Sequence, residues 1–137
     1  MTTVDRVVAL QRVPLFADVP GRTLASVAMR ATEVEAGVGD VVIVQGAVED
    51  HLFAVVHGRL EARDGDRLLR ELEVGATVGE LAALAPEPRS ATVTALAPTL
   101  LLRIDRPVLD ELLADHPELA RGVITSLVRM IRSTRPS

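Results

Sequence analysis

The length, composition and charge of the sequence exclude several classes of protein. The chain has 137 residues, which fits one compact domain with a single core, and 48% of them are hydrophobic and 25% charged, as in an ordinary globular protein rather than a disordered one. Its net charge is −4, all its basic residues are arginines, and acids and arginines alternate instead of forming a basic tract, so direct nucleic-acid binding by this chain is disfavoured.

The first part of the chain, residues 3–32, predicts two short helices. Apolar residues from Val4 to Val13 have the spacing of a short amphipathic helix, and Pro14 stops it. A second helix opens near Gly21. Four of its residues are expected to face the core: Leu24, Val27, Ala28 and Met29.

Short extended segments follow between residues 33 and 104. β-Branched residues concentrate in them, and glycines separate them where sharp turns are expected. The pair Asp64-Gly65 lies between residues 59–63 and 67–72, which predicts a hairpin with a tight turn. Further strands are expected at residues 33–35, 41–45, 52–56, 92–96 and 99–104. Strands of this length and spacing predict a small barrel or roll.

Residues 79–92 interrupt the strands with one helical turn. Gly79 is followed by an acid and four small or apolar residues, which predicts a helix whose first N–H groups have no internal partner and attract anions. Arg89 lies a short loop further on. If the loop folds back, the guanidinium and these N–H groups converge on one spot that suits a phosphate.

Residues 105–134 predict two more helices. Asp105 can cap the first, and the sequence Asp115-His116-Pro117 ends it and starts the second, which runs to about residue 132. The apolar residues between 119 and 131 cover more than the single stripe that a surface helix needs. Part of this face is therefore expected to pack against a lid or against a partner chain.

Several kinds of site have no support in the sequence. Phe16 and Phe53 are the only aromatic residues, which disfavours a base-stacking surface, and the absence of cysteine excludes disulfides and thiolate chemistry. The three histidines, His51, His57 and His116, do not have metal-ligand spacing, so we expect no metal site. No apolar run reaches the length of a membrane span, and no signal peptide is recognisable, so we expect a cytoplasmic location.

The order of these elements resembles the cyclic nucleotide-binding domain shared by the catabolite activator family, protein kinase A regulatory subunits and cyclic-nucleotide-gated channels. The phosphate-binding cassette of that family is similar to residues 79–92, where Gly79-Glu80-Leu81-Ala82 and Pro88-Arg89-Ser90-Ala91-Thr92 stand at the family's spacing. Pro14-Leu15-Phe16 and His116-Pro117-Glu118-Leu119 also match. The resemblance covers nearly the whole chain and implies an α+β fold. It would be a double-stranded β-helix, a jelly-roll-like β roll over residues 33–104, flanked by N-terminal and C-terminal helices.

The resemblance implies a role for each residue of the cassette. Arg89 would pair with the phosphate of a cyclic nucleotide, a contact that lysine could not reproduce bidentately. Glu80 would accept a hydrogen bond from the ribose 2′-hydroxyl, and Ser90 would add its hydroxyl to the phosphate or to a guanine. Gly79 and the backbone N–H groups of Leu81, Ala82 and Ala91 would complete the anion cradle. The base would rest on aliphatic strand residues such as Val55, under the last helix.

Without the resemblance, Arg89 would be read as a solvated arginine or as an ion-pair partner of Glu80 or Glu87. Glu80 alone would be a first-turn acid that interacts with the helix dipole. Ser90 would be a strand-start hydroxyl. The full cassette favours phosphate binding over these interpretations.

The resemblance implies a regulatory sensor rather than an enzyme, with no cofactor beyond its ligand. We expect it to bind cAMP in preference to cGMP and to signal through its C-terminal helices, either to an attached effector domain or across a homodimer. A second hypothesis is a ligand-independent interaction or dimerisation module, because Pro86-Glu87-Pro88 stiffens the cassette loop and adds a negative charge to it. A third, a cupin-like metal enzyme, would need histidines and acids clustered inside the roll.

Overall fold

The computed structural model describes residues 1–79, 84–85 and 87–133. Two helices and a short 3-10 turn come first: α1 (Thr3–Gln11), η1 (Pro14–Phe16) and α2 (Gly21–Arg30). Thr2 and Asp5 cap the start of α1 reciprocally, each side chain accepting a hydrogen bond from the other's backbone N–H. The inward positions predicted for α2 are confirmed except for Met29, whose side chain is 75% exposed on the outer face of the helix.

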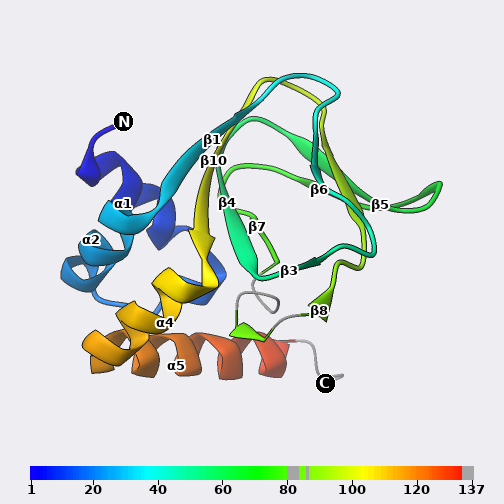
Figure 1. The fold of residues 1–137 in the computed structure, drawn as a ribbon. Helices are drawn as coiled ribbons and strands as arrows, with labels where there is room; N and C mark the ends of the chain where they lie inside the picture. The colour runs from blue at the N-terminus through cyan, green and yellow to red at the C-terminus, as the bar shows by residue number, and fades with distance from the viewer. Residues whose placement is uncertain (80–83, 86, 134–137) are drawn as a thin grey trace.

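The middle of the chain forms an antiparallel β roll (Figure 1). One sheet has the order β1-β10-β4-β7, a second has the order β2-β9-β5-β6, and β3 and β8 form a separate pair. Strands β5 and β6 form the predicted hairpin across Asp64-Gly65. The strand bounds are β1 Thr32–Ala36, β2 Val41–Ile43, β3 Val48–Glu49, β4 His51–His57, β5 Leu60–Asp64, β6 Arg67–Leu72, β7 Thr77–Val78, β8 Glu87–Pro88, β9 Thr92–Ala95 and β10 Thr99–Asp105.

Strand β4, which pairs with β10 and β7, is buried on both faces for most of its length. Successive side chains of a strand point to opposite faces, and in β4 Leu52 and Ala54 join the core beneath the helices, whereas Phe53 and Val55 join the core inside the roll. The sequence of β4 is accordingly an almost unbroken apolar run. The sheet thereby connects the helices to the interior of the roll.

The C-terminal helices are α4 (Arg106–Asp115) and α5 (Pro117–Ser133), and they lie below the roll in Figure 1. The predicted break before Pro117 is confirmed. Asp105 occupies the N-cap position of α4, but its side chain makes no capping hydrogen bond and instead lies 3.1 Å from Nε of Arg103. Residue 134, the predicted end of the helical region, lies outside the described residues.

Helix α5 is fixed to the loop after η1 by polar contacts. The Ser126 hydroxyl donates to Asp18 Oδ2 at 3.2 Å, and Arg129 Nη2 donates to Asp18 Oδ1 at 2.9 Å. Gly122 lets the helix approach this loop closely, because a Cβ there would lie 2.8 Å from the Asp18 carbonyl oxygen. No helix in the described part of the chain is long and apolar enough to cross a membrane.

Candidate functional site

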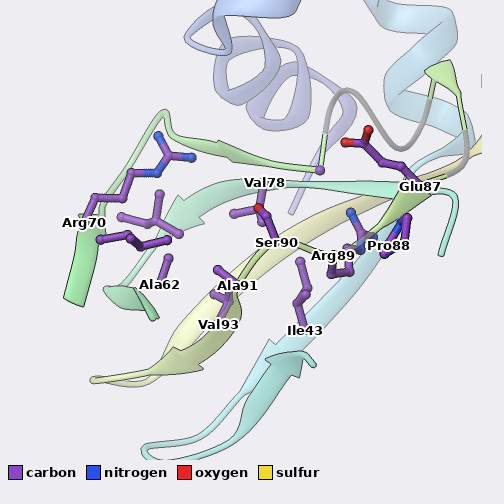
Figure 2. A pocket seen from close by; sticks show the side chains of 13 residues that line it. Ile43, Ala62, Arg70, Val78, Glu87, Pro88, Arg89, Ser90, Ala91 and Val93 are labelled. Carbon is purple, nitrogen blue, oxygen red and sulfur yellow. The ribbon is translucent and has the colours of Figure 1, made fainter. Parts of the chain in front are cut away.

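A cavity of about 250 Å³ opens between the two sheets of the roll (Figure 2). Its walls are mostly aliphatic, and its polar side chains come from β6, from β8 and from the residues that follow β8. The aliphatic lining includes Ile43, Ala62, Leu72, Val78 and Val93. The polar lining is Arg70, Glu87, Arg89 and Ser90. Aliphatic walls with a few convergent polar groups are typical of small-ligand sites.

The backbone of Arg89 is held in place by the loop between β2 and β3. Its N–H donates to the Ala47 carbonyl oxygen and its own carbonyl oxygen accepts from the Gly46 N–H, each at 2.8 Å. These two bonds extend the pairing of β3 with β8, in which Val48 faces Pro88 and Glu49 faces Glu87. The position of Arg89 is therefore set by segments some 40 residues earlier in the chain.

The guanidinium of Arg89 is buried and only partly satisfied. The residue is 6% exposed; Nε donates to Glu49 Oε1 at 3.3 Å and Nη2 donates to the His51 carbonyl oxygen at 2.6 Å. Nη1 is also buried, and it has no hydrogen-bond partner among the described residues. A buried, unpaired donor on a charged group is costly and calls for an acceptor. An anion bound in the cavity would supply that acceptor.

Gly79 lies against this unpaired nitrogen. Its φ is +82°, in the left-handed region that favours glycine, and a Cβ built on it would overlap Nη1 of Arg89. The residue therefore combines a turn that few side chains tolerate with a close approach to the guanidinium. Both requirements explain why glycine stands here.

Glu49 and His51 form the surroundings of Arg89 that sequence reasoning missed. His51 Nε2 lies 3.8 Å from Glu49 Oε2, and the imidazole meets the Phe53 ring edge-on at 5.0 Å. Burial lowers the pKa of His51 below its usual range, and the Glu49 carboxylate only partly opposes this. His51 is therefore neutral at pH 7, and Arg89 is the charged partner of Glu49 there. No local pattern points to Glu49, because the contact joins residues 40 positions apart.

The structure brings together four of the predicted site residues: Gly79, Arg89, Ser90 and Ala91 all line the cavity. Glu80, Leu81 and Ala82 lie outside the described residues, as does Pro86. Val55 is buried in the roll core and does not line the cavity. The aliphatic residues that line the cavity include Ile43 and Leu72 instead.

Arg70 is a further lining residue that sequence reasoning did not single out. It projects from β6, and its Nη2 donates to the Thr77 carbonyl oxygen at 3.2 Å. Figure 2 shows it at the opposite end of the cavity from Glu87 and Arg89. The alternating pattern of β6 could have placed Arg70 on the same face as Leu72, but not at a cavity.

Curated relatives share part of this sequence, and solved structures share this architecture. The chain is 32% identical over 122 residues to a cAMP-dependent protein kinase regulatory subunit of Blastocladiella emersonii, with 85% of this chain and 30% of that protein covered. It is 27% identical over 130 residues to a CRP-like cAMP-activated global transcriptional regulator of Mycobacterium tuberculosis, with 91% and 58% covered. The chain thus spans less than two thirds of the length of these curated relatives.

Among solved structures, the N-terminal domain of a transcriptional regulator from Streptomyces coelicolor superposes with a TM-score of 0.85 at 30% identity, over 93% of this chain and 94% of that one. A cyclic nucleotide-binding-like protein from Brucella abortus superposes with a TM-score of 0.72 at 25% identity, over 80% and 98%. The family model for the cyclic nucleotide-binding domain matches residues 33–116, which include the roll, the cavity and α4. The chain therefore belongs to the cyclic nucleotide-binding domain family.

Proposed function

We propose that this chain binds a cyclic nucleotide in the cavity and that Arg89 holds its phosphate. The observation that carries the proposal is the buried Nη1 of Arg89, which has no partner among the described residues and lies at the cavity beside Gly79. A phosphate oxygen at this nitrogen would complete the hydrogen bonding of a guanidinium that Glu49 and the His51 carbonyl oxygen already orient. The aliphatic walls would take the sugar and the base.

Within this proposal, cAMP is the favoured ligand over cGMP. Two relatives carry cAMP in their names, the kinase regulatory subunit and the transcriptional regulator. We further propose that Glu80 binds the ribose 2′-hydroxyl, that the backbone of Leu81, Ala82 and Ala91 contributes N–H groups, and that Ser90 contacts the phosphate. A cytoplasmic location also stays a prediction.

Titration calorimetry with cAMP and cGMP tests the proposal. Heat of binding is expected for the unchanged chain, and it should be lost on Arg89→Ala because the phosphate loses its charged donor. Arg67→Ala removes an exposed arginine of β6 that does not line the cavity and should bind as the unchanged chain does. Absence of heat and of any thermal shift at millimolar nucleotide would overturn the proposal and favour a ligand-independent module.

We propose that helix α5 transmits the binding event, either to an attached effector domain or to a second copy of the chain. Ile124, Val128 and Ile131 are exposed on α5 at intervals of four and three residues, so they form one apolar stripe. A second copy presenting the same stripe would bury both. This role is regulatory and involves no catalysis by the chain itself.

Sedimentation velocity of the isolated chain tests the homodimer. A dimer that becomes a monomer on Ile124→Glu is expected, since a charge in the buried stripe would be desolvated. Val4→Glu changes an exposed apolar residue on α1 and should leave the dimer intact. A monomer at all concentrations would leave an attached effector as the route of output.

A further inference from the structure

Two carboxylates, those of Glu49 and Glu87, belong to residues near the Arg89 guanidinium in the described part of the chain. Glu49 contacts Arg89 directly, and Glu87 is the residue opposite Glu49 in the antiparallel β3–β8 pair. Glu87 also lines the cavity together with Arg89. His51, the remaining titratable neighbour among the described residues, is neutral at pH 7. Among the described residues, this end of the cavity is therefore lined by one cation, Arg89, and one carboxylate, Glu87, while the Glu49 carboxylate pairs with Arg89 from outside the lining.

The hydrogen-bonding capacity of Arg89 is also limited. Glu49 occupies Nε and the His51 carbonyl oxygen occupies Nη2, so Nη1 is the nitrogen left for a ligand. Among the described lining residues Arg70 is the other cation, but it lies at the far end, where it donates a hydrogen bond to the Thr77 carbonyl oxygen (Figure 2). An anion with a single charge can be satisfied at Nη1. A second charge on the same anion would meet no further cation among the described residues at this end of the cavity, which Glu87 also lines.

The backbone of Glu87 is fixed at this place. Glu87 belongs to β8, which pairs with β3. Arg89, two residues further on, forms backbone hydrogen bonds with Gly46 and Ala47. The backbone pairing that positions Arg89 thus also keeps Glu87, whose side chain is exposed, at the cavity. Like charges directly opposite each other on paired strands are unfavourable, so Glu49 and Glu87 have no stabilising effect on one another.

We propose that Glu87 is a charge-selective residue that admits a singly charged phosphodiester and rejects a doubly charged phosphomonoester. A cyclic nucleotide is a phosphodiester with one negative charge, whereas a linear nucleoside 5′-monophosphate carries about 1.5 to 2 negative charges at pH 7 because its second pKa is about 6. Repulsion from Glu87 acts on both, but about twice as strongly on the dianion. The inference rests on the proposed function and adds discrimination between cyclic nucleotides and their linear products.

Competition between cAMP and 5′-AMP for the purified chain tests this inference. The measured quantity is the dissociation constant of 5′-AMP divided by that of cAMP, at low salt and pH 7.5. Glu87→Gln is expected to lower this ratio by about five- to tenfold, as expected for removal of one charge across a few ångströms of partly solvated cavity. Glu87→Asp keeps the charge and should keep most of the discrimination. Glu73→Gln removes an exposed acid that does not line the cavity and should leave the ratio unchanged.

The outcomes separate this inference from the proposed function. If the unchanged chain binds cAMP but Glu87→Gln leaves the ratio unaltered, the inference is overturned and the proposed function stands. If the unchanged chain binds no cyclic nucleotide, both are overturned. Should Glu87→Gln fail to fold, the unchanged chain is compared at pH 7.5 and pH 5.5, where the monoester has lost most of its second charge. A smaller ratio of the two dissociation constants at pH 5.5 supports charge selection, and an unchanged ratio overturns the inference.

Discussion

Gly79 and Nη1 of Arg89 are in contact so close that no side chain could stand between them. Replacing Gly79 with alanine is expected to push the guanidinium away from its place beside Glu49 and to lower cyclic-nucleotide affinity by more than about tenfold. The positive φ adds about 1 kcal/mol of destabilisation or more. Titration calorimetry and thermal denaturation measure the two effects.

Gly39→Ala is the matched control for this substitution. Gly39 has nearly the same φ, +87°, but an added Cβ there would have nothing within 4 Å. The control should therefore lose stability and keep its affinity. Equal affinities for the two variants would show that the contact with Arg89 is irrelevant to binding.

Lysine in place of Arg89 is expected to weaken cyclic-nucleotide binding by about tenfold to a hundredfold. The ammonium keeps the charge but cannot bond at once to Glu49, to the His51 carbonyl oxygen and to a phosphate in the geometry that the guanidinium provides. Equilibrium titration with a fluorescent cyclic nucleotide measures the change. Arg67→Lys should bind normally, and an unaffected Arg89→Lys variant would mean that charge alone suffices.

The stability of the protein should fall as the pH is lowered from 7.5 to 5.5. Burial lowers the pKa of His51 in the folded state, so the unfolded chain binds a proton first as the pH falls through the unperturbed value of about 6.5. The contribution of neutral His51 to the free energy of unfolding is present above a pH of about 6.5. It is lost as the pH falls towards the pKa of His51 in the folded state. Urea denaturation at the two pH values measures the loss.

His51→Gln should reduce this dependence on pH, because the group that titrates is removed. His57, exposed at the other end of β4, supplies the control substitution His57→Gln, which should retain the dependence. The other groups with a resolved downward pKa shift among the described acids, Asp5 and Glu118, titrate below this range. A dependence that survives His51→Gln would point to another group.

Gly122→Ala should destabilise the fold although alanine favours helices. The helix preference is worth about 1 kcal/mol, but the new Cβ would lie 2.8 Å from both the Asp18 carbonyl oxygen and Val19 Cγ2. Overpacking of this kind costs roughly 1–3 kcal/mol, so the net change is a loss of up to about 2 kcal/mol. Calorimetry should show a lower Tm, and Thr125→Ala on the exposed side of α5 should show little change. A raised Tm for Gly122→Ala would mean that α5 can shift away from the loop at low cost.

Local sequence signals were sufficient for the helices and for the longer strands. Pro117 marks the start of α5, and the Asp64-Gly65 turn identified a hairpin. Helix α1 ends at Gln11, two residues before the end predicted ahead of Pro14. Met29 was placed wrongly because its position lies at the margin of the apolar stripe, where spacing alone does not separate the two faces. Strands β3, β7 and β8 were missed because two residues are too few to show an alternating pattern.

The candidate site was predictable only where one continuous motif carries it. Gly79, Arg89, Ser90 and Ala91 belong to the cassette, and the structure places all four at the cavity. Glu49, Arg70 and the aliphatic wall reach the cavity from other strands through the roll topology. No spacing rule links them to the cassette, because pairing between distant strands decides which side chains meet.

The hydrogen bonds from Arg89 to Glu49 and to the His51 carbonyl oxygen also affect the rate at which a ligand binds. An arginine side chain free in solution carries about 2 kcal/mol of rotamer entropy, and here most of that freedom is already lost to protein contacts. An arriving phosphate therefore does not have to immobilise the group that binds it. Capture should be limited by passage of the nucleotide into the roll, and the energy of the phosphate contact should appear mainly as slow release.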